Sequence, residues 1–209
     1  MPRYATARFK AETRRVRREQ IEKAALQSVL KHGFPNSSLR IVAKEAKVPL
    51  SILHYYFKDK DDLMLAVVKR IFDGTVERLI QVQAREKDAL RRTEALLKTY
   101  VMLTTENWQA TLAVIEYWAA SVRKGTVDKF YTQLHFRYRE LLGEALREAG
   151  AKNPDGHALA LLGMMVGYAT FYRTKVADPA ERERFLEFAR AMVRRAVVHG
   201  KRGVRIVRR

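Results

Sequence analysis

The chain has 209 residues, 47% of them hydrophobic, which suits one large domain or two small ones around a buried core. It has no cysteine, so disulfides, cysteine-based zinc sites and a cysteine nucleophile are excluded. No apolar run of about 18 residues is present, and the basic N-terminus lacks the apolar segment of a secretory signal. We therefore expect a soluble, cytoplasmic protein without a membrane span.

Positive charge is concentrated at both ends of the chain, whose formal net charge is +18. Residues 1–60 carry fourteen lysines and arginines against five acidic residues, and residues 194–209 carry seven basic residues and no acid. Such an excess favours a polyanionic partner, whether DNA, RNA or an anionic membrane surface. Charge alone also suits an ordinary basic protein, so the partner has to be argued from motifs.

Helical periodicity runs through the chain, whereas β-branched alternation is scarce and only five prolines and ten glycines interrupt the pattern. The pattern predicts an all-α fold of about nine helices. Their expected ranges are 12–32, 39–46, 50–57, 60–83, 88–106, 109–123, 127–149, 155–176 and 180–198.

The first two expected helices have clear boundary signals. Gly33 suits the left-handed residue that follows many helices, and Ser38 has the side chain of an N-cap for the second helix. Apolar residues at helical spacing predict the inward faces of both helices. The expected inward residues are Ile21, Ala24, Ala25, Val29, Ile41, Val42 and Ala46.

Residues 38–60 describe two short helices joined by a tight turn and followed by aromatics and lysines. Pro49 disfavours continuation of the preceding helix and suits the start of the next one. The inward pair of the second short helix is expected to be Ile52 or Leu53 with Tyr56 or Phe57. The pattern is typical of a helix-turn-helix DNA reader, whose second helix enters the major groove.

The expected DNA contacts are the residues of this motif that the core does not need. Serine, histidine and tyrosine can reach bases or phosphates, and lysine and arginine can neutralise phosphates. The N-terminus of helix 60–83, which Asp59 should cap, can do so through its dipole. Tyr56 is expected to be a packing residue, and Leu50 either contacts DNA or packs inside. The predicted DNA-binding residues are Ser38, Arg40, Leu50, Ser51, His54, Tyr55, Lys58 and Lys60.

Residues 19–64 closely resemble the DNA-binding domain of TetR-family transcriptional repressors. The likeness rests on the Ile21–Phe34 segment with its paired alanines, on Ser38–Ala43, and on Leu53-His-Tyr-Tyr-Phe-Lys-Asp-Lys60 followed by Leu63. Three positions depart from the family pattern. They are Lys47 at the usual turn glycine, Pro49 at a usually polar position, and His54 as the first aromatic of the tyrosine pair.

The resemblance implies an N-terminal basic arm with a helix-turn-helix DNA-binding domain at 1–60, a ligand-binding and dimerisation domain at 61–199, and a basic tail at 200–209. It implies a dimer formed through the last two helices, a palindromic operator, and a small ligand that usually releases DNA. The His-Tyr-Tyr-Phe wording and an apolar-aromatic helix with Trp118 look most like the choline-responsive repressors of betaine synthesis. The basic arm Arg3–Arg18 either contacts DNA or is a disordered solubilising tail.

Aromatic residues of the body indicate a small-molecule pocket. Such pockets are lined by apolar and aromatic groups with a few polar ones, and Glu116 beside Tyr117 and Trp118 suits a cationic ligand. The alternative is that the aromatics fill the core and that Glu116 pairs with an arginine. The predicted ligand-binding residues are Trp108, Glu116, Tyr117, Trp118, Tyr138 and Tyr168.

The expected helix 155–176 is apolar almost all round, which predicts either deep burial or a subunit interface. With helix 180–198 it can form a four-helix bundle with the same helices of a second copy. The predicted interface residues are Leu161, Met164, Met165, Tyr168, Phe188 and Met192, of which Met164, Met165 and Tyr168 can instead line the ligand pocket.

These features predict a homodimeric repressor that binds double-stranded operator DNA and responds to a small-molecule effector, with no cofactor and no metal. An enzyme is disfavoured because the sequence has no phosphate-binding glycine loop, nucleophile elbow or paired-histidine zinc motif. The alternative is a sequence-neutral nucleic-acid-binding architectural protein. A membrane-surface protein is disfavoured because the basic helices lack a strong apolar face.

Overall fold

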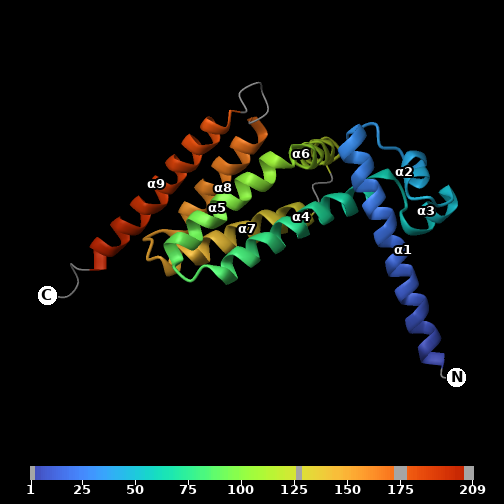
Figure 1. Ribbon diagram of the computed structural model, residues 1–209, viewed down its shortest axis with the longest axis horizontal. Helices are drawn as coiled ribbons and strands as arrows, with labels where there is room; N and C mark the ends of the chain where they lie inside the picture. The colour runs from blue at the N-terminus through green and yellow to red at the C-terminus, as the bar shows by residue number, and fades with distance from the viewer. Residues whose placement is uncertain (1–2, 126–128, 172–177, 205–209) are drawn as a thin grey trace. The chain divides into compact units, whose positions relative to one another are not determined.

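The computed structural model describes residues 3–125, 129–171 and 178–204, and the side chains of 10–125, 135–171 and 178–198. Within these ranges it contains nine helices and no strand (Figure 1). They are α1 Arg3–His32, α2 Leu39–Glu45, α3 Leu50–Tyr56, α4 Lys60–Arg85, α5 Ala89–Glu106, α6 Trp108–Arg123, α7 Lys129–Glu148, α8 Pro154–Phe171 and α9 Pro179–Val204. The predicted all-α class is confirmed.

The main differences from the expected helices lie at the two ends of the chain. Helix α1 begins at Arg3, nine residues before its predicted start, and α9 continues to Val204. The basic arm is therefore part of a helix. The predicted end of the eighth helix at residue 176 and the last five residues of the basic tail lie outside the described residues.

The chain divides into two compact units. The first, which we call the head, comprises Met1–Ile71 and Leu112–Ala120; the second, the body, comprises Phe72–Thr111 and Ser121–Arg209. This division differs from a boundary at residue 60, because the first turns of α4 and the middle of α6 belong to the head.

The head is built around one apolar core, in which α1 contacts α2 and α2 contacts α3. The predicted stripe of α1 is confirmed, since Ile21, Ala25 and Val29 are buried and Ala24 packs against them. The expectation for Ile41 is wrong: it is exposed, because α2 buries Val42 and the face next to it. The buried residues of this core are Ile21, Ala25, Val29, Val42, Ala43, Ala46, Leu53, Phe57, Leu63, Met64, Ala66, Val67 and Ala113.

The body is organised around α5, which contacts α7, α8 and α9, while α7 packs along α8. An aromatic cluster joins three of its segments: the Tyr138 ring lies 5.3 Å from that of Tyr100 and 6.2 Å from that of Phe72. An ion pair between Arg194 and Glu94, 2.8 Å apart, links α9 to α5 at the surface. In the part of the chain that the structure describes, no helix is long and apolar enough to cross a membrane.

Candidate DNA-binding surface

Helix α3 has one face locked into the head core and one face turned to solvent. Leu53 and Phe57 are fully buried, which resolves the two alternatives for its inward pair. Ser51, His54 and Tyr55 are exposed, and Tyr55 is 62% exposed. Tyr56 and Leu50 both pack against the core, so the packing alternative describes Leu50 as well as Tyr56. A short helix held in this way presents its polar side chains at defined positions.

The turn between α2 and α3 is a helix C-cap with a lysine at its left-handed position. Lys47 has a φ of 55°, the one positive φ among described residues other than glycine. The Val48 N–H donates to the Ala43 carbonyl at 3.0 Å, and the Lys47 N–H donates to the Lys44 carbonyl at 3.1 Å. These two bonds form a Schellman motif, in which glycine is the usual residue at that position. Lysine in place of the family's usual glycine therefore keeps the geometry of the turn and adds backbone strain.

Ser38 and Arg40 lie at the start of α2. The Ser38 hydroxyl oxygen accepts the Ile41 N–H at 3.3 Å, which confirms the predicted N-cap. Its own O–H hydrogen remains available to donate to an outside acceptor. Arg40 is exposed. Both side chains have the chemistry of a phosphate contact, and their DNA-binding role stays a prediction.

Lys58 and Lys60 flank a reciprocal cap at the start of α4. The Asp59 carboxylate accepts the Asp62 N–H at 2.9 Å, and the Asp62 carboxylate accepts the Lys58 N–H at 3.1 Å. The predicted cap by Asp59 is therefore confirmed. These two aspartates also place negative charge at the N-terminus of α4. The sequence predicts that this N-terminus contacts a DNA phosphate.

The Lys60 side chain turns back into the head, whereas Lys58 is exposed. The Lys60 ammonium donates to the Pro35 carbonyl at 2.8 Å and lies 5.2 Å from the centre of the Phe34 ring. Burial lowers its pKa, while the charges of Asp61 and Glu116 act in the opposite direction. Lys60 thus stabilises the loop after α1 through its ammonium group. The exposed Lys58 is the lysine of this pair that can contact a phosphate.

Helix α1 contacts α3 through arginine side chains, and the sequence did not predict this contact. The Arg14 guanidinium lies 5.9 Å from the centre of the exposed Tyr55 ring, and the Arg18 guanidinium lies 4.8 Å from that of Phe57. Both are cation–π contacts within the usual range. No local pattern pairs residue 14 with residue 55; the contact follows from the continuous helix α1.

Two of the predicted ligand-binding residues are part of the head's own packing. The Glu116 carboxylate accepts the Phe34 N–H at 3.3 Å, and the Tyr117 ring packs edge-on against Phe34 at 6.2 Å. Trp118, next to them, is among the exposed large apolar residues. The contacts of Glu116 and Tyr117 are therefore explained by packing within the head. The cation site predicted at Glu116, Tyr117 and Trp118 stays a prediction.

The other predicted ligand-binding residues lie in the body and are not gathered around one described cavity. Tyr138 is buried in the aromatic cluster, where the cavity it borders holds about 10 Å³, the space of about one water molecule. The Tyr168 ring stacks on Phe185 with 4.2 Å between ring centres, and Trp108 begins α6. The prediction of a single six-residue pocket thus gains no support from these positions.

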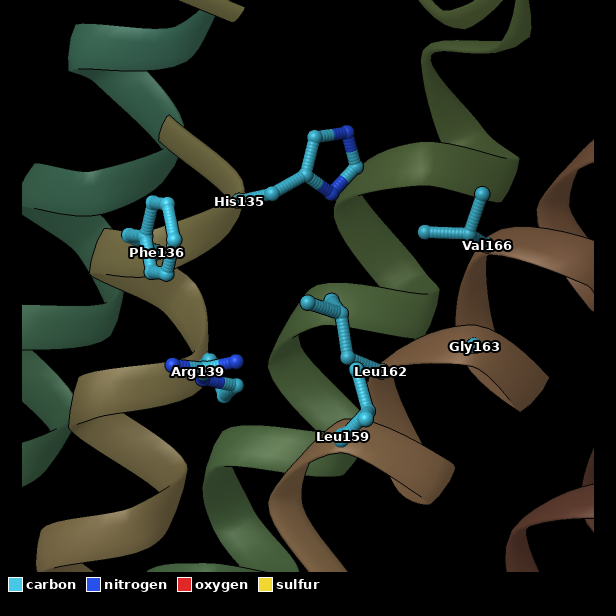
Figure 2. A pocket seen from close by; sticks show the side chains of 7 residues that line it. All are labelled: His135, Phe136, Arg139, Leu159, Leu162, Gly163 and Val166. Atoms are coloured by element: carbon cyan, nitrogen blue, oxygen red, sulfur yellow. The ribbon is translucent and has the colours of Figure 1, made fainter. Parts of the chain in front are cut away.

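A larger cavity opens between α7 and α8, with a volume of about 450 Å³. We call it the α7–α8 groove, and Figure 2 shows the side chains of α7 and α8 that line it. The Arg139 guanidinium lies 4.8 Å from the centre of the Phe136 ring, and burial lowers the pKa of His135. The lining residues are His135, Phe136, Arg139, Leu159, Leu162, Gly163 and Val166.

The predicted interface residues divide into buried and accessible ones. Leu161 and Met165 are each 2% exposed, so they lie in the core of a single protomer. Met164, Tyr168 and Met192 are half-buried. Phe188, the sixth predicted residue, is 60% exposed. Helix α8 also exposes two large apolar residues that were not predicted, Phe171 at 70% and Leu159 at 58%.

No three His, Asp or Glu side chains among the described residues lie close enough together to hold a metal ion. The described head surface instead offers hydroxyl, imidazole, phenol, ammonium and guanidinium groups. All of these groups can donate hydrogen bonds, and the ammonium and guanidinium groups also carry positive charge. Such groups suit phosphates and base edges.

Comparison with known sequences finds the same motif. Residues 21–67 match the family model described as bacterial regulatory proteins, tetR family. The chain is 30% identical over 107 residues to the HTH-type transcriptional regulator BetI of Burkholderia mallei (strain NCTC 10229), covering 51% of this chain and 53% of that protein. It is 29% identical over 154 residues to BetI of Burkholderia ambifaria (strain MC40-6), covering 71% and 76%. The first of these matches spans about half the length of the relative.

Solved structures share the fold. A TetR transcription regulator from Haloarcula marismortui has a TM-score of 0.76 at 20% identity, over 86% of this chain and 97% of that chain. AibR in complex with isovaleryl coenzyme A and operator DNA has a TM-score of 0.61 at 19% identity, over 84% and 97%. The matched head, the BetI-named relatives and the shared helical architecture lead to one conclusion. Residues 21–67 are the N-terminal domain of the tetR family of bacterial regulatory proteins, and the chain beyond them is similar to BetI-named relatives in sequence.

Proposed function

We propose that the protein is a cytoplasmic transcriptional repressor that binds a two-fold symmetric DNA operator as a homodimer and is released by a small-molecule effector. The observation that carries the proposal is the two-sided helix α3. Leu53 and Phe57 hold it in the head core, while Ser51, His54 and Tyr55 face solvent. A short helix fixed in this way can enter a major groove without disturbing the fold.

The proposed dimer forms through the exposed apolar surface of α8 and α9. Phe171 and Phe188 are large apolar side chains that a single protomer leaves in water, and small residues such as Ala160 and Gly163 lie exposed on α8. Apolar surface of this kind is typical of protein interfaces, and small residues allow close helix approach. A dimer also supplies two reading helices, which a two-fold symmetric operator requires.

We propose the α7–α8 groove as the effector site. Its volume of about 450 Å³ falls in the usual range for small-molecule sites, and its apolar lining suits an apolar ligand. Arg139 forms no ion pair with the described residues and supplies a fixed positive charge. We therefore propose an effector with an apolar body and an anionic group, which contrasts with the cationic ligand implied by the resemblance to choline-responsive repressors.

Thermal denaturation separates these two effector classes. A medium-chain carboxylate is expected to raise the melting temperature of the protein, and the Arg139→Gln variant is expected to lose that shift. A shift with choline and none with the carboxylate would overturn the anionic proposal and favour the cationic ligand.

Selection of bound duplexes from a random DNA pool at about 150 mM salt tests the function itself, since non-specific phosphate binding is weak under these conditions. We expect an enriched two-fold symmetric motif. Equal recovery of all sequences, with and without candidate effectors, would instead favour the sequence-neutral architectural protein.

A further inference from the structure

The first turns of α1 extend from the head as a helix with no apolar face. From Lys10 to Arg18 every side chain is exposed, and the first fully buried residue of α1 is Ile21. At 1.5 Å per residue, the described side chains before Ile21 cover about 16 Å of helix. Figure 1 shows this part of α1 continuing past α2 and α3. Packing within the head therefore does not account for it.

The charges of this extension are sorted between two faces. Arg15 forms ion pairs with Glu12 and Glu19, each at 2.7 Å, so that one face is internally neutralised. Lys10 and Arg14 lie four residues apart on the face that continues into Ile21 and the head core. Neither forms an ion pair with any side chain that the structure describes. The unneutralised charge thus lies on the side of the helix that faces α3.

The position of Arg14 links this face to the reading helix. Its guanidinium lies 5.9 Å from the centre of the Tyr55 ring, so the extension and the exposed side of α3 form one continuous surface. Arginine binds phosphate through two parallel N–H donors, and lysine binds it as a point charge. A surface that combines base-reading groups with unpaired cations suits the edge of a DNA groove.

We propose that the N-terminal turns of α1 are a second DNA-binding element, in which Lys10 and Arg14 contact the phosphate backbone beside the bases that α3 reads. This proposal rests on the proposed function and lengthens the DNA contact of each head. An anionic membrane is a weaker fit, because Val16 is the one large apolar residue between Lys10 and Arg18 and an interfacial helix needs an apolar face.

The experiment compares two double variants of the full-length protein with equal net charge. The test variant is Lys10→Gln with Arg14→Gln, and the control is Lys23→Gln with Lys31→Gln, two exposed α1 lysines outside the Lys10–Arg14 face. Glutamine preserves helix propensity, so both variants should keep the helix content of the wild type. Operator affinity is measured as a function of salt, together with the length of DNA protected from cleavage.

We expect the test variant to reduce the steepness of log K against log salt by about 1.8 per head, or 0.9 for each lost phosphate contact. The control should reduce it far less. The protected DNA should shorten at the outer edge of each half-site. The ratio of operator to random-DNA affinity should change little, since phosphate contacts carry no sequence information. A merely structural action of Arg14 through Tyr55 would instead lower that ratio and leave the salt slope unchanged.

Equal slopes for test variant, control and wild type on a specific operator would overturn this inference and leave the proposed function intact. If the wild-type protein preferred no operator, both this inference and the proposed function would be overturned. Loss of binding to phosphatidylserine vesicles by the test variant, with unchanged DNA binding, would also overturn the inference and assign the surface to a membrane.

Discussion

The head and the body of this protein present their candidate binding surfaces in different ways. In the head, the polar surface comes from residues 38–60, whose positions are set by the Ser38 cap, the Lys47 turn and the reciprocal cap of Asp59 and Asp62. In the body, the groove and the exposed apolar residues come from α7, α8 and α9. Local hydrogen bonds thus define the first surface, and helix packing defines the second.

The two surfaces also differ in what they leave exposed. The head exposes groups that donate hydrogen bonds or carry positive charge, and it buries Leu53 of α3 and Phe57 directly after it. The body exposes Phe171 and Phe188 on its last two helices. The contrast teaches that the head is suited to a polyanion and the body to apolar partners, and five substitutions test this division.

The largest effect is expected from Phe57→Ala, because Phe57 is fully buried in the head core. Truncation of a buried phenylalanine costs about 3 to 5 kcal/mol in stability. Urea unfolding should report this loss, and operator binding should fall with it. The dimer should persist in sedimentation, since α8 and α9 belong to the body. Dissociation of the dimer by this variant would break the division between the two surfaces.

Phe188→Asp places a charge on the exposed apolar surface of α9. If Phe188 lies in the dimer interface, the change should weaken association by about 2 kcal/mol or more, as expected for an interface anchor. Sedimentation at decreasing protein concentration measures the effect. Val122→Asp on α6, also at an exposed apolar residue, is the matched control and should leave the dimer unchanged. Met165 is unsuitable for this test because it is buried within the protomer.

Tyr55→Ala should weaken operator binding by about 1 to 3 kcal/mol, the usual range for a specific contact. The stability of the protein should change by no more than about 0.5 kcal/mol, because Tyr55 is largely exposed. Binding titrations and urea unfolding measure the two effects. Tyr56→Ala should do the reverse and lower stability first, since Tyr56 packs against the core. Wild-type affinity in Tyr55→Ala would remove α3 from the proposed interface.

Glu116→Ala sharpens the distinction between packing and ligand binding. The carboxylate accepts the Phe34 N–H, so its removal should cost about 1 kcal/mol of head stability. Glu116→Gln should recover part of this loss, because its amide oxygen can accept the same hydrogen bond. The effector response should be unchanged in both variants. A lost response at full stability would restore Glu116 to a ligand site.

The smallest effect, and the one of opposite sign, is expected from Lys47→Gly. The left-handed conformation of Lys47 costs a residue with a side chain about 1 kcal/mol, which glycine relieves at some cost in unfolded-state entropy. The net gain in stability should be about 0.5 kcal/mol by chemical unfolding. Lys44→Gly, inside α2, should instead lose about 0.5 to 1 kcal/mol. A destabilised Lys47→Gly variant would mean that the lysine side chain stabilises the turn.

Much of the head was predictable because its signals are local. Gly33, Ser38, Pro49 and Asp59 mark helix boundaries within a turn of the residues they affect, and those boundaries are where the pattern predicts them. The error at Ile41 has a physical reason: a seven-residue helix has room for one buried face, and Val42 and Ala43 occupy it. The periodicity of so short a segment does not distinguish neighbouring faces.

The body was less predictable because its residues have several possible partners. The apolar pattern of α8 does not tell which side faces α7 and α9 and which faces solvent. Leu161 and Met165 were predicted in a dimer interface, and both are buried within the chain. Aromatic residues near a carboxylate indicated a pocket at Glu116, whereas the nearest partner of that carboxylate is Phe34, 82 residues away. Distant pairs of this kind leave no spacing signal.

By itself, the sequence determined the helical class, most of the helix boundaries among the described residues and the helix-turn-helix motif, because helix periodicity and capping depend on residues a few positions apart. The tertiary structure alone decided that Arg14 lies beside Tyr55, that Lys60 turns toward Pro35, and that the middle of α6 joins the head. These facts depend on how distant helices pack, where shape and buried area choose among many partners with similar local chemistry.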